Sequence, residues 1–293
     1  WPLRADSLAA NGGERDCDLI HLELDRAKAL IDDAELYIYT PSPDDPVRVV
    51  LAGDRNATLV GKGLQARLPR DRDGSLKQVD ITILSDPLLT TPGAVARARG
   101  RLWYVEDTAS GTAKLTLADD VELDLDRSDG FMVDGKRVAG SNREKVHLVA
   151  DQMLAWLARG DVVNAKGQTV EQMTWRMLQL HGAPTRIELP ELRVSTPKLT
   201  VLPGPFGMPY WITASGGISH IDQVPGLDAK NAQPIHGSSP RRIHLFRGSE
   251  MLGATHRSFG FPQWAITPFE GFHTVAFDGD SHIEDSLRTV DAS

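Results

Sequence analysis

The sequence predicts a mainly β protein: an antiparallel β-jellyroll or open roll built of repeated short strands, with room for one or two short helices. Three observations predict this fold class. Apolar and polar residues alternate with period two over many short segments, as they do along strands that bury one face. Gly, Pro and Asp clusters separate these segments at fairly regular spacing. The segments do not alternate with long helical patterns, as they would in a parallel sheet.

The clearest strand runs from Ala113 to Asp126. Its apolar residues fall on one face and its polar residues on the other, and Asp119 and Asp120 interrupt the pattern, which predicts a turn or bulge there. Further strands are predicted around residues 79–83, 187–189, 192–194, 199–201 and 243–245. Turns are predicted at 41–46, 61–63, 71–74, 129–130, 134–135, 203–207 and 216–217.

Two segments fit a helix and a strand equally well. Between Glu144 and Arg159 the apolar residues Val146, Ala150 and Met153 follow helical spacing, and Gly160 is placed to end such a helix. Alternation through Val146 and Leu148 favours a strand instead. Residues 25–33 leave the same choice open.

The pattern divides the chain into three regions. Residues 18–222 form a repeated-strand β-jellyroll region, with two stacked units at about 18–140 and 141–222 as one alternative. Residues 223–240 are rich in Pro, Gly and Ser and are predicted to be a linker. Residues 241–293 hold most of the chain's Phe and are predicted to be a C-terminal extension that packs on the preceding sheet or closes it.

The composition excludes several classes of function. With 32 Lys and Arg against 40 Asp and Glu the formal net charge is −8, and no basic block is present, so nucleic acid is not expected as a partner. No apolar run approaches the roughly 18 residues that a membrane-spanning helix needs. The single Cys17 excludes an internal disulfide framework and a multi-cysteine zinc site. The first residues, from Trp1, carry no apolar signal core, so export is allowed but is not predicted by a targeting segment.

Two parts of the chain are weakly similar to each other. One reads AVARARG (94–100), RLWYV (101–105), AKLTL (113–117) and DVELDL (120–125). The other reads WRMLQLHG (175–182), TRIEL (185–189), ELRVST (191–196), KLTVL (198–202) and YWITASGGI (210–218). Each is a series of short strands broken by Gly at a turn.

Together with REKVHLVADQML (143–154) and ITASGGISHI (212–221), these segments resemble the lipopolysaccharide-transport β-jellyroll superfamily over residues 18–222. That family contains a periplasmic bridge protein, its membrane-anchored neighbour and the amino-terminal domain of the outer-membrane translocon. The chain departs from a single bridge module in its length, in showing no membrane anchor and in its aromatic segment after Pro240.

The resemblance implies a non-enzymatic, periplasmic protein that needs no cofactor and shields acyl chains inside an apolar roll. Its ligand would be lipopolysaccharide or another amphiphile, and its partners other envelope β-jellyroll proteins that pair with it through edge strands. The interior apolar positions expected to contact lipid are Leu115, Leu117, Val121, Leu123, Leu199 and Val201.

Catalytic motifs are largely absent. The chain has no G-x-S-x-G elbow, and it has neither a G-x-G-x-x-G nor a Walker loop. Histidines and acids gather in the last quarter without the spacing of a known metal motif, so no metal site is predicted there; the residues are His236, His244, His256, His273, His282, Asp278, Asp280, Glu284 and Asp285. They leave a carbohydrate-active enzyme on a β scaffold as the alternative function, beside a structural β protein that binds partners through strand edges.

Two further residue sets have a structural and a functional interpretation. The acidic run from Asp119 to Asp129 fits the polar face of a solvated strand better than a cation site. Aromatic residues in strands are more often core or cross-strand pairs than ligand contacts, although a carbohydrate or lipid surface remains an alternative for them. These residues are Trp103, Tyr104, Trp156, Trp175, Tyr210 and Trp211.

Overall fold

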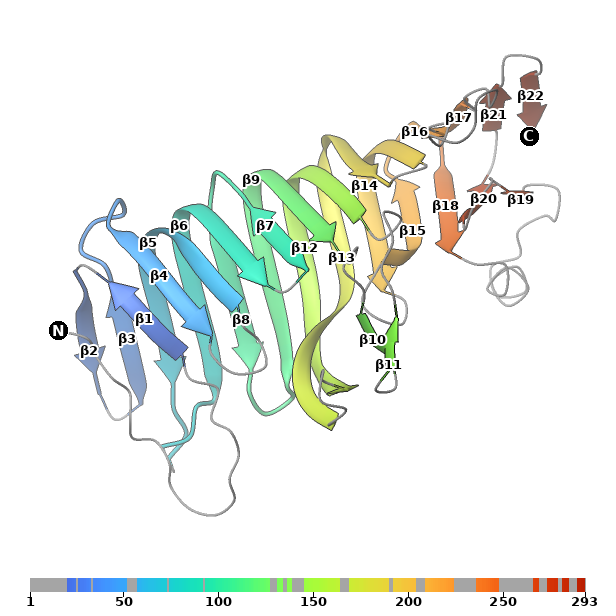
Figure 1. The fold of residues 1–293 in the computed structure, drawn as a ribbon. Helices are drawn as coiled ribbons and strands as arrows, with labels where there is room; N and C mark the ends of the chain where they lie inside the picture. The colour runs from blue at the N-terminus through green and yellow to red at the C-terminus, as the bar shows by residue number, and fades with distance from the viewer. Residues whose placement is uncertain are drawn as a thin grey trace. The chain divides into compact units, whose positions relative to one another are not determined.

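The computed structural model describes residues 20–24, 26–32, 34–51, 57–72, 74–91, 93–126, 131–133, 136–138, 145–163, 169–189, 192–203, 209–223, 236–247, 266–268, 273–278, 281–284 and 289–292. Every regular element in these residues is a β-strand, and each pairing whose register is given is antiparallel (Figure 1). The predicted all-β, antiparallel fold is therefore confirmed. Residues 145–163 form one strand, which settles the choice between helix and strand there.

The strands follow the chain in this order. The first nine are β1 (Ile20–Leu24), β2 (Lys28–Ile31), β3 (Glu35–Tyr39), β4 (Pro46–Leu51), β5 (Ala57–Pro69), β6 (Gln78–Thr91), β7 (Ala94–Arg97), β8 (Leu102–Asp107) and β9 (Thr112–Asp126). Next come β10 (Phe131–Val133), β11 (Lys136–Val138), β12 (Lys145–Val163), β13 (Thr169–Glu188), β14 (Leu192–Pro203), β15 (Pro209–Ser215) and β16 (Ser219–Gln223). The last are β17 (His236–Ser239), β18 (Arg242–Arg247), β19 (Ile266–Pro268), β20 (His273–Asp278), β21 (Ser281–Glu284) and β22 (Thr289–Ala292).

The chain divides into two compact units, and the division falls within long strands. Unit 1 comprises residues 1–123 and 156–174, and unit 2 comprises residues 124–155 and 175–293. Each unit combines two separate segments of the chain, whereas the predicted regions 18–222, 223–240 and 241–293 are continuous segments. That division into regions stays a prediction. Within the predicted linker, residues 224–235 lie outside the described residues, and residues 236–239 form β17.

In unit 1 the long strands pair with different neighbours along their two halves. β5 pairs with β4 over Ala57–Lys62 and with β3 over Gln65–Pro69. β6 likewise pairs with β8 through its first half and with β7 through its second. The sheet is thereby folded into two layers, which we call the β4–β7 layer and the β3–β8 layer (Figure 1).

The fold between the layers falls at residues with left-handed backbone conformation. Gly63 on β5, Asp86 on β6 and Asp119 with Asp120 on β9 have φ values of 67°, 50°, 66° and 50°. A left-handed residue redirects the strand, so that both halves present apolar side chains to the same interior. The interruption predicted at Asp119 and Asp120 is confirmed, and the exposed Asp86 is fixed by an ion pair with Lys62 at 2.8 Å.

Between the two layers lies the core of unit 1. Period-two alternation places one side-chain set of every strand inside, which removes large apolar areas from water at about 25 cal/mol per Å². The buried set includes Val47, Val49, Leu59, Leu64, Ala66, Ile81, Ile83, Leu102, Leu115, Leu117, Val121 and Leu123.

Unit 2 repeats this arrangement. The first half of β14 pairs with β16, and its second half pairs with β15. From there β15 continues to β18 and β20, while β16 continues to β17 and β21. The two layers of unit 2 therefore contain β15, β18 and β20 on one side and β16, β17 and β21 on the other.

A row of buried hydroxyl groups lines the fold between the layers of unit 2. Thr185 is opposite Thr196 in the register of β13 and β14, and Ser219 is opposite Ser239 in that of β16 and β17. Thr196 Oγ1 lies 2.8 Å from Ser219 Oγ and donates to the Ser215 carbonyl at 2.9 Å. Where the sheet bends from one layer to the other, the backbone hydrogen bonds between strands are interrupted. The hydroxyl groups supply hydrogen-bond partners for backbone groups that lack them there.

Thr196→Val should lower the free energy of unfolding by about 1–2 kcal/mol, because it leaves the buried Ser219 hydroxyl and the partly buried Ser215 carbonyl without this partner. Urea unfolding measures the change. Thr200→Val, on the same strand but facing outward, is the matched control and should cost less than about 0.5 kcal/mol. Equal losses in the two variants would contradict a special role for the hydroxyl row.

Candidate functional site

The six residues predicted to contact lipid all lie inside the two units. Their side chains are between 0% and 8% exposed. Four of them are on β9 in unit 1, and two are on β14 in unit 2. The structure thus gathers them into two groups rather than one.

The group on β9 lines both layers of unit 1. Leu115 and Leu117 are opposite Tyr104 and Leu102 of β8 and belong to the β3–β8 layer. Val121 and Leu123 follow the fold at Asp119–Asp120, so they belong to the β4–β7 layer. The two pairs therefore line the same interior from two sides.

The group on β14 lies in one layer of unit 2. Leu199 is opposite Leu180 and Ala214, and Val201 is opposite Leu178 and Ile212. The second layer contributes Ile187, Val194 and Ile221, all of them buried. As the molecule stands, these side chains pack against one another as a core, so an acyl chain would have to replace contacts between the layers.

Strand β2 forms an exposed edge in unit 1. It pairs with β3, and all four of its side chains are exposed, with Leu30 at 61% and Ile31 at 72%. Ile31 is opposite Leu36 in this register. A fully exposed apolar strand is a template for pairing with another strand. The sequence predicted pairing through edges without indicating which strand provides one.

A polar group interrupts the interior of unit 1. Glu106 on β8 is 4% exposed and accepts hydrogen bonds from Arg159 Nη2 at 2.8 Å and from the Tyr104 hydroxyl at 2.7 Å. Arg159 is on β12, and its backbone amide donates to the Gly111 carbonyl at 2.8 Å. This group was missed because no motif contains it; the available signal was a carboxylate at an inward position of an alternating strand.

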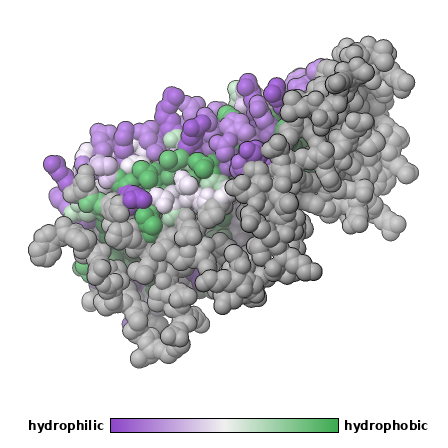
Figure 2. Space-filling model, viewed as in Figure 1, coloured by the Kyte–Doolittle hydropathy of each residue, from purple (hydrophilic) through white to green (hydrophobic). Residues whose placement is uncertain are grey.

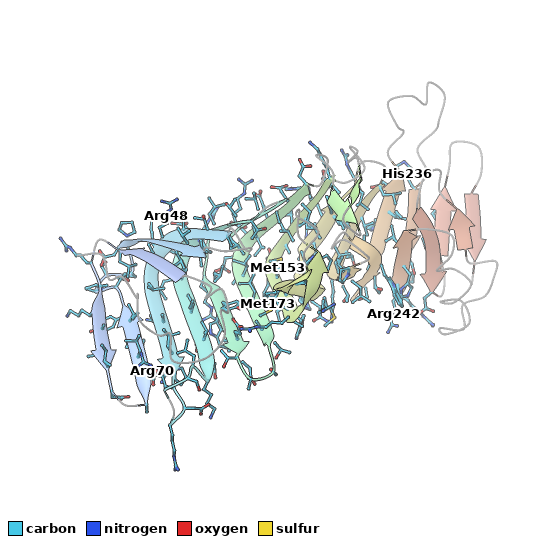
Figure 3. The ribbon with its side chains drawn as sticks, turned by 60° about the horizontal axis from the view of Figure 1, so that its bottom comes forward. Arg48, Arg70, Met153, Met173, His236 and Arg242 are labelled. Carbon is cyan, nitrogen blue, oxygen red and sulfur yellow. The ribbon has the colours of Figure 1, made fainter. Side chains whose placement is uncertain are left out.

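In the part of the chain that the structure describes, the histidines and acids of the last quarter lie on both layers of unit 2: His236 is opposite Glu284 in the register of β17 and β21, whereas His244 is on β18. His236 on β17 contacts Asp222 at 2.6 Å on the surface. His244 is buried on β18, in the other layer. Arg242 is on the same strand as His244, and Figure 3 shows His236 and Arg242 on opposite sides of unit 2. His256, Asp280 and Asp285 lie outside the described residues. No group of three or more potential metal ligands occurs among the described residues.

His244 has the most perturbed environment of these groups. Its Nδ1 lies 3.0 Å from Thr213 Oγ1 and 3.5 Å from Trp211 Nε1. Burial lowers the pKa of His244 to about 4; the Arg242 cation adds to the effect and Asp278 opposes it. At pH 7 the ring is therefore neutral, and its Nδ1 is placed to accept from the Trp211 indole N–H and from the Thr213 hydroxyl.

As far as Asp126 the acidic run lies on the outside of the strand, as its alternation predicted, and Asp129 lies outside the described residues. Asp120 pairs with Arg99 at 3.1 Å and Glu122 pairs with Arg97, while in unit 2 Asp124 contacts His147 at 2.6 Å. Most of these side chains are substantially solvated, so the pairs stabilise little individually.

The outer surface is not uniformly polar. Figure 2 shows hydrophobic surface beside hydrophilic surface over the N-terminal strands. Val60 and Leu88, which are opposite each other on β5 and β6, are exposed on the β4–β7 layer. The described residues contain no helix that could cross a membrane. No protein-family model, curated protein or solved structure matches this chain.

Proposed function

We propose that this protein is a non-enzymatic amphiphile-handling or bridging protein of the periplasm, similar to lipopolysaccharide-transport components. Its ligand is lipopolysaccharide or another amphiphile, whose acyl chains enter between the two layers. The observation that carries the proposal is the apolar inner face, which is present on both layers in each unit, with Leu115, Leu117, Val121 and Leu123 in unit 1 and Leu199 and Val201 in unit 2.

The connectivity allows the layers to separate without loss of the sheet. In unit 1 the ladders run within a layer and around the fold, so the contacts across the interior are made by side chains. Each acyl CH₂ transferred from water to this interior is stabilised by about 0.8 kcal/mol, which offsets the side-chain contacts that it replaces.

The proposed protein partners are other envelope β-jellyroll proteins. Strand β2 supplies the edge, since its exposed backbone groups can hydrogen-bond an incoming strand and Leu30 and Ile31 can pack against that strand's side chains. Addition of a strand there would extend the β3–β8 layer and its apolar inner face.

The proposal is tested by photo-crosslinking with p-benzoylphenylalanine. In place of Leu123 or Tyr104, which face inward, the probe should label lipopolysaccharide or phosphatidylethanolamine added in parallel samples. In place of Glu122, the neighbour of Leu123 that faces outward, it should label neither. Replacement of Tyr104 should disturb the packing less than replacement of Leu123, because Tyr104 is aromatic and only partly buried.

Circular dichroism and thermal unfolding establish that each variant is folded. Failure of both inward probes to label either lipid in folded protein would contradict the proposal. Equal labelling from inward and outward positions would also contradict it, because it would indicate adsorption to the surface.

A further inference from the structure

The outward face of the β3–β8 layer carries four aromatic side chains in unit 1. Tyr37 and Tyr39 are on β3, Trp103 is on β8 and Trp156 is on β12. Trp103 is 42% exposed although it is the largest side chain type, whereas Leu102 and Glu106, on the inward face of the same strand, are buried. Aromatic side chains that gather on one exposed face, rather than singly, can mark a surface that binds a ligand.

The register arranges this face as two neighbouring rows that cross the strands. Each row places an aromatic ring among groups that form hydrogen bonds. The first row is Tyr39, Gln65, Thr82, Trp103 and Thr116, and the second is Tyr37, Arg67, Asp80, Val105 and Lys114.

The rings are held in place before any ligand binds. Trp103 Nε1 donates to Asp80 Oδ1 at 2.8 Å. The rings of Tyr37 and Tyr39 are stacked with centroids 5.2 Å apart and an interplanar angle of 21°. Lys114 Nζ lies 5.8 Å from the centre of the Trp156 ring. Rings fixed in this way lose little conformational entropy on binding.

The charges of the face are largely matched. Arg67 Nε donates to Glu35 Oε1 at 2.7 Å, and this hydrogen bond lowers the pKa of Glu35 and raises that of Arg67. Asp80 is also opposite Arg67 in the register of β5 and β6, so the two carboxylates of Glu35 and Asp80 balance the two cations of Arg67 and Lys114 in formal charge. The face therefore favours an uncharged ligand over an anion or a cation.

We propose that this face binds an extended, uncharged, β-linked polysaccharide laid across the strands. A pyranose ring has an apolar face of C–H groups that stacks on an aromatic ring, and a rim of hydroxyls that suits Gln65, Thr82 and Thr116. Strands are spaced about 4.8 Å apart, close to the length of one sugar in an extended β-linked chain, so Tyr39 and Trp103 stand about three sugars apart. The site lies opposite the inner face and does not depend on the proposed lipid function.

The test is a titration of the full chain, labelled with ¹⁵N, with chitohexaose and separately with cellohexaose. The chain has six tryptophans, whose indole N–H signals are assigned by single replacement. We expect at least one sugar to shift the signals of Trp103 and Trp156 and to leave that of Trp211 in place. Trp103→Ala should weaken binding at least about tenfold, as expected for a central aromatic contact. Trp103→Phe should weaken binding less than Trp103→Ala does, because an aromatic ring is kept.

Leu88→Ala is the matched control, since it removes an exposed apolar side chain from the other layer of the same unit. The proposal is overturned if neither sugar moves the Trp103 signal at millimolar concentration, or if Leu88→Ala weakens binding as much as Trp103→Ala. It is also overturned if the Trp103 signal shifts with protein concentration in the absence of sugar, because the occupant is then a second copy of the chain. The spectrum of each variant shows whether it is folded.

Discussion

Arg159→Leu should lower the free energy of unfolding by about 3 kcal/mol, the low end for breaking a buried ion pair, because Arg159 is partly solvated. The loss comes from Glu106, whose carboxylate is buried inside unit 1. Of its two hydrogen-bond partners, Arg159 and Tyr104, it would keep only the Tyr104 hydroxyl. Leucine keeps much of the aliphatic stem that packs against Gly111. Urea unfolding at pH 7 measures the effect.

Two further variants separate the charge effect from lost packing. Arg159→Leu combined with Glu106→Leu should recover most of the stability, since no unpaired charge then stays in the interior. Arg97→Leu removes the cation of an exposed pair with Glu122 and should cost less than about 1 kcal/mol. If Arg159→Leu costs no more than Arg97→Leu, the buried pair is unimportant for stability.

Alternation predicted those strands in which the buried face keeps its period. β9 was recognised because its apolar residues alternate on either side of Asp119–Asp120. β12 was ambiguous for a physical reason: Val146, Leu148 and Ala150 are buried, Asp151 and Gln152 are exposed, and Met153 and Ala155 are buried. The exposed pair lengthens one step from two residues to three, which places Val146, Ala150 and Met153 at helical spacing.

The interior positions proposed for lipid contact were accessible to sequence reasoning, whereas the polar parts of the site were not. Leu115 and Leu123 follow directly from alternation. Glu106 resembles any strand carboxylate until Arg159, 53 residues later, is placed beside it. The hydroxyl row at Thr196 and Ser219 is equally invisible, because Ser and Thr are compatible with either face of a strand.

Lowering the pH from 7.5 to 5 should cost about 2 kcal/mol of stability through His244 alone, and about 3 kcal/mol by pH 4. The folded-state pKa of about 4 is below the value of about 6.5 expected in the unfolded chain. The neutral ring is therefore favoured by folding, so its contribution is complete above pH 6.5 and is lost as the pH falls toward 4. Urea unfolding across this range measures the loss.

His244→Asn isolates this effect, because an amide oxygen can accept the hydrogen bonds of Nδ1 from Thr213 and Trp211 but does not titrate. Carboxylates elsewhere contribute equally to both proteins, so the difference between the two stability curves reports His244. We expect the variant to be less stable than the wild type at pH 7.5 and to lose less stability on acidification. Parallel curves from pH 7.5 to 4 would mean that His244 is protonated in the folded protein as readily as in the unfolded chain. The His244 ring would then have to be accessible to water, and its contacts with Trp211 and Thr213 would have to open in solution.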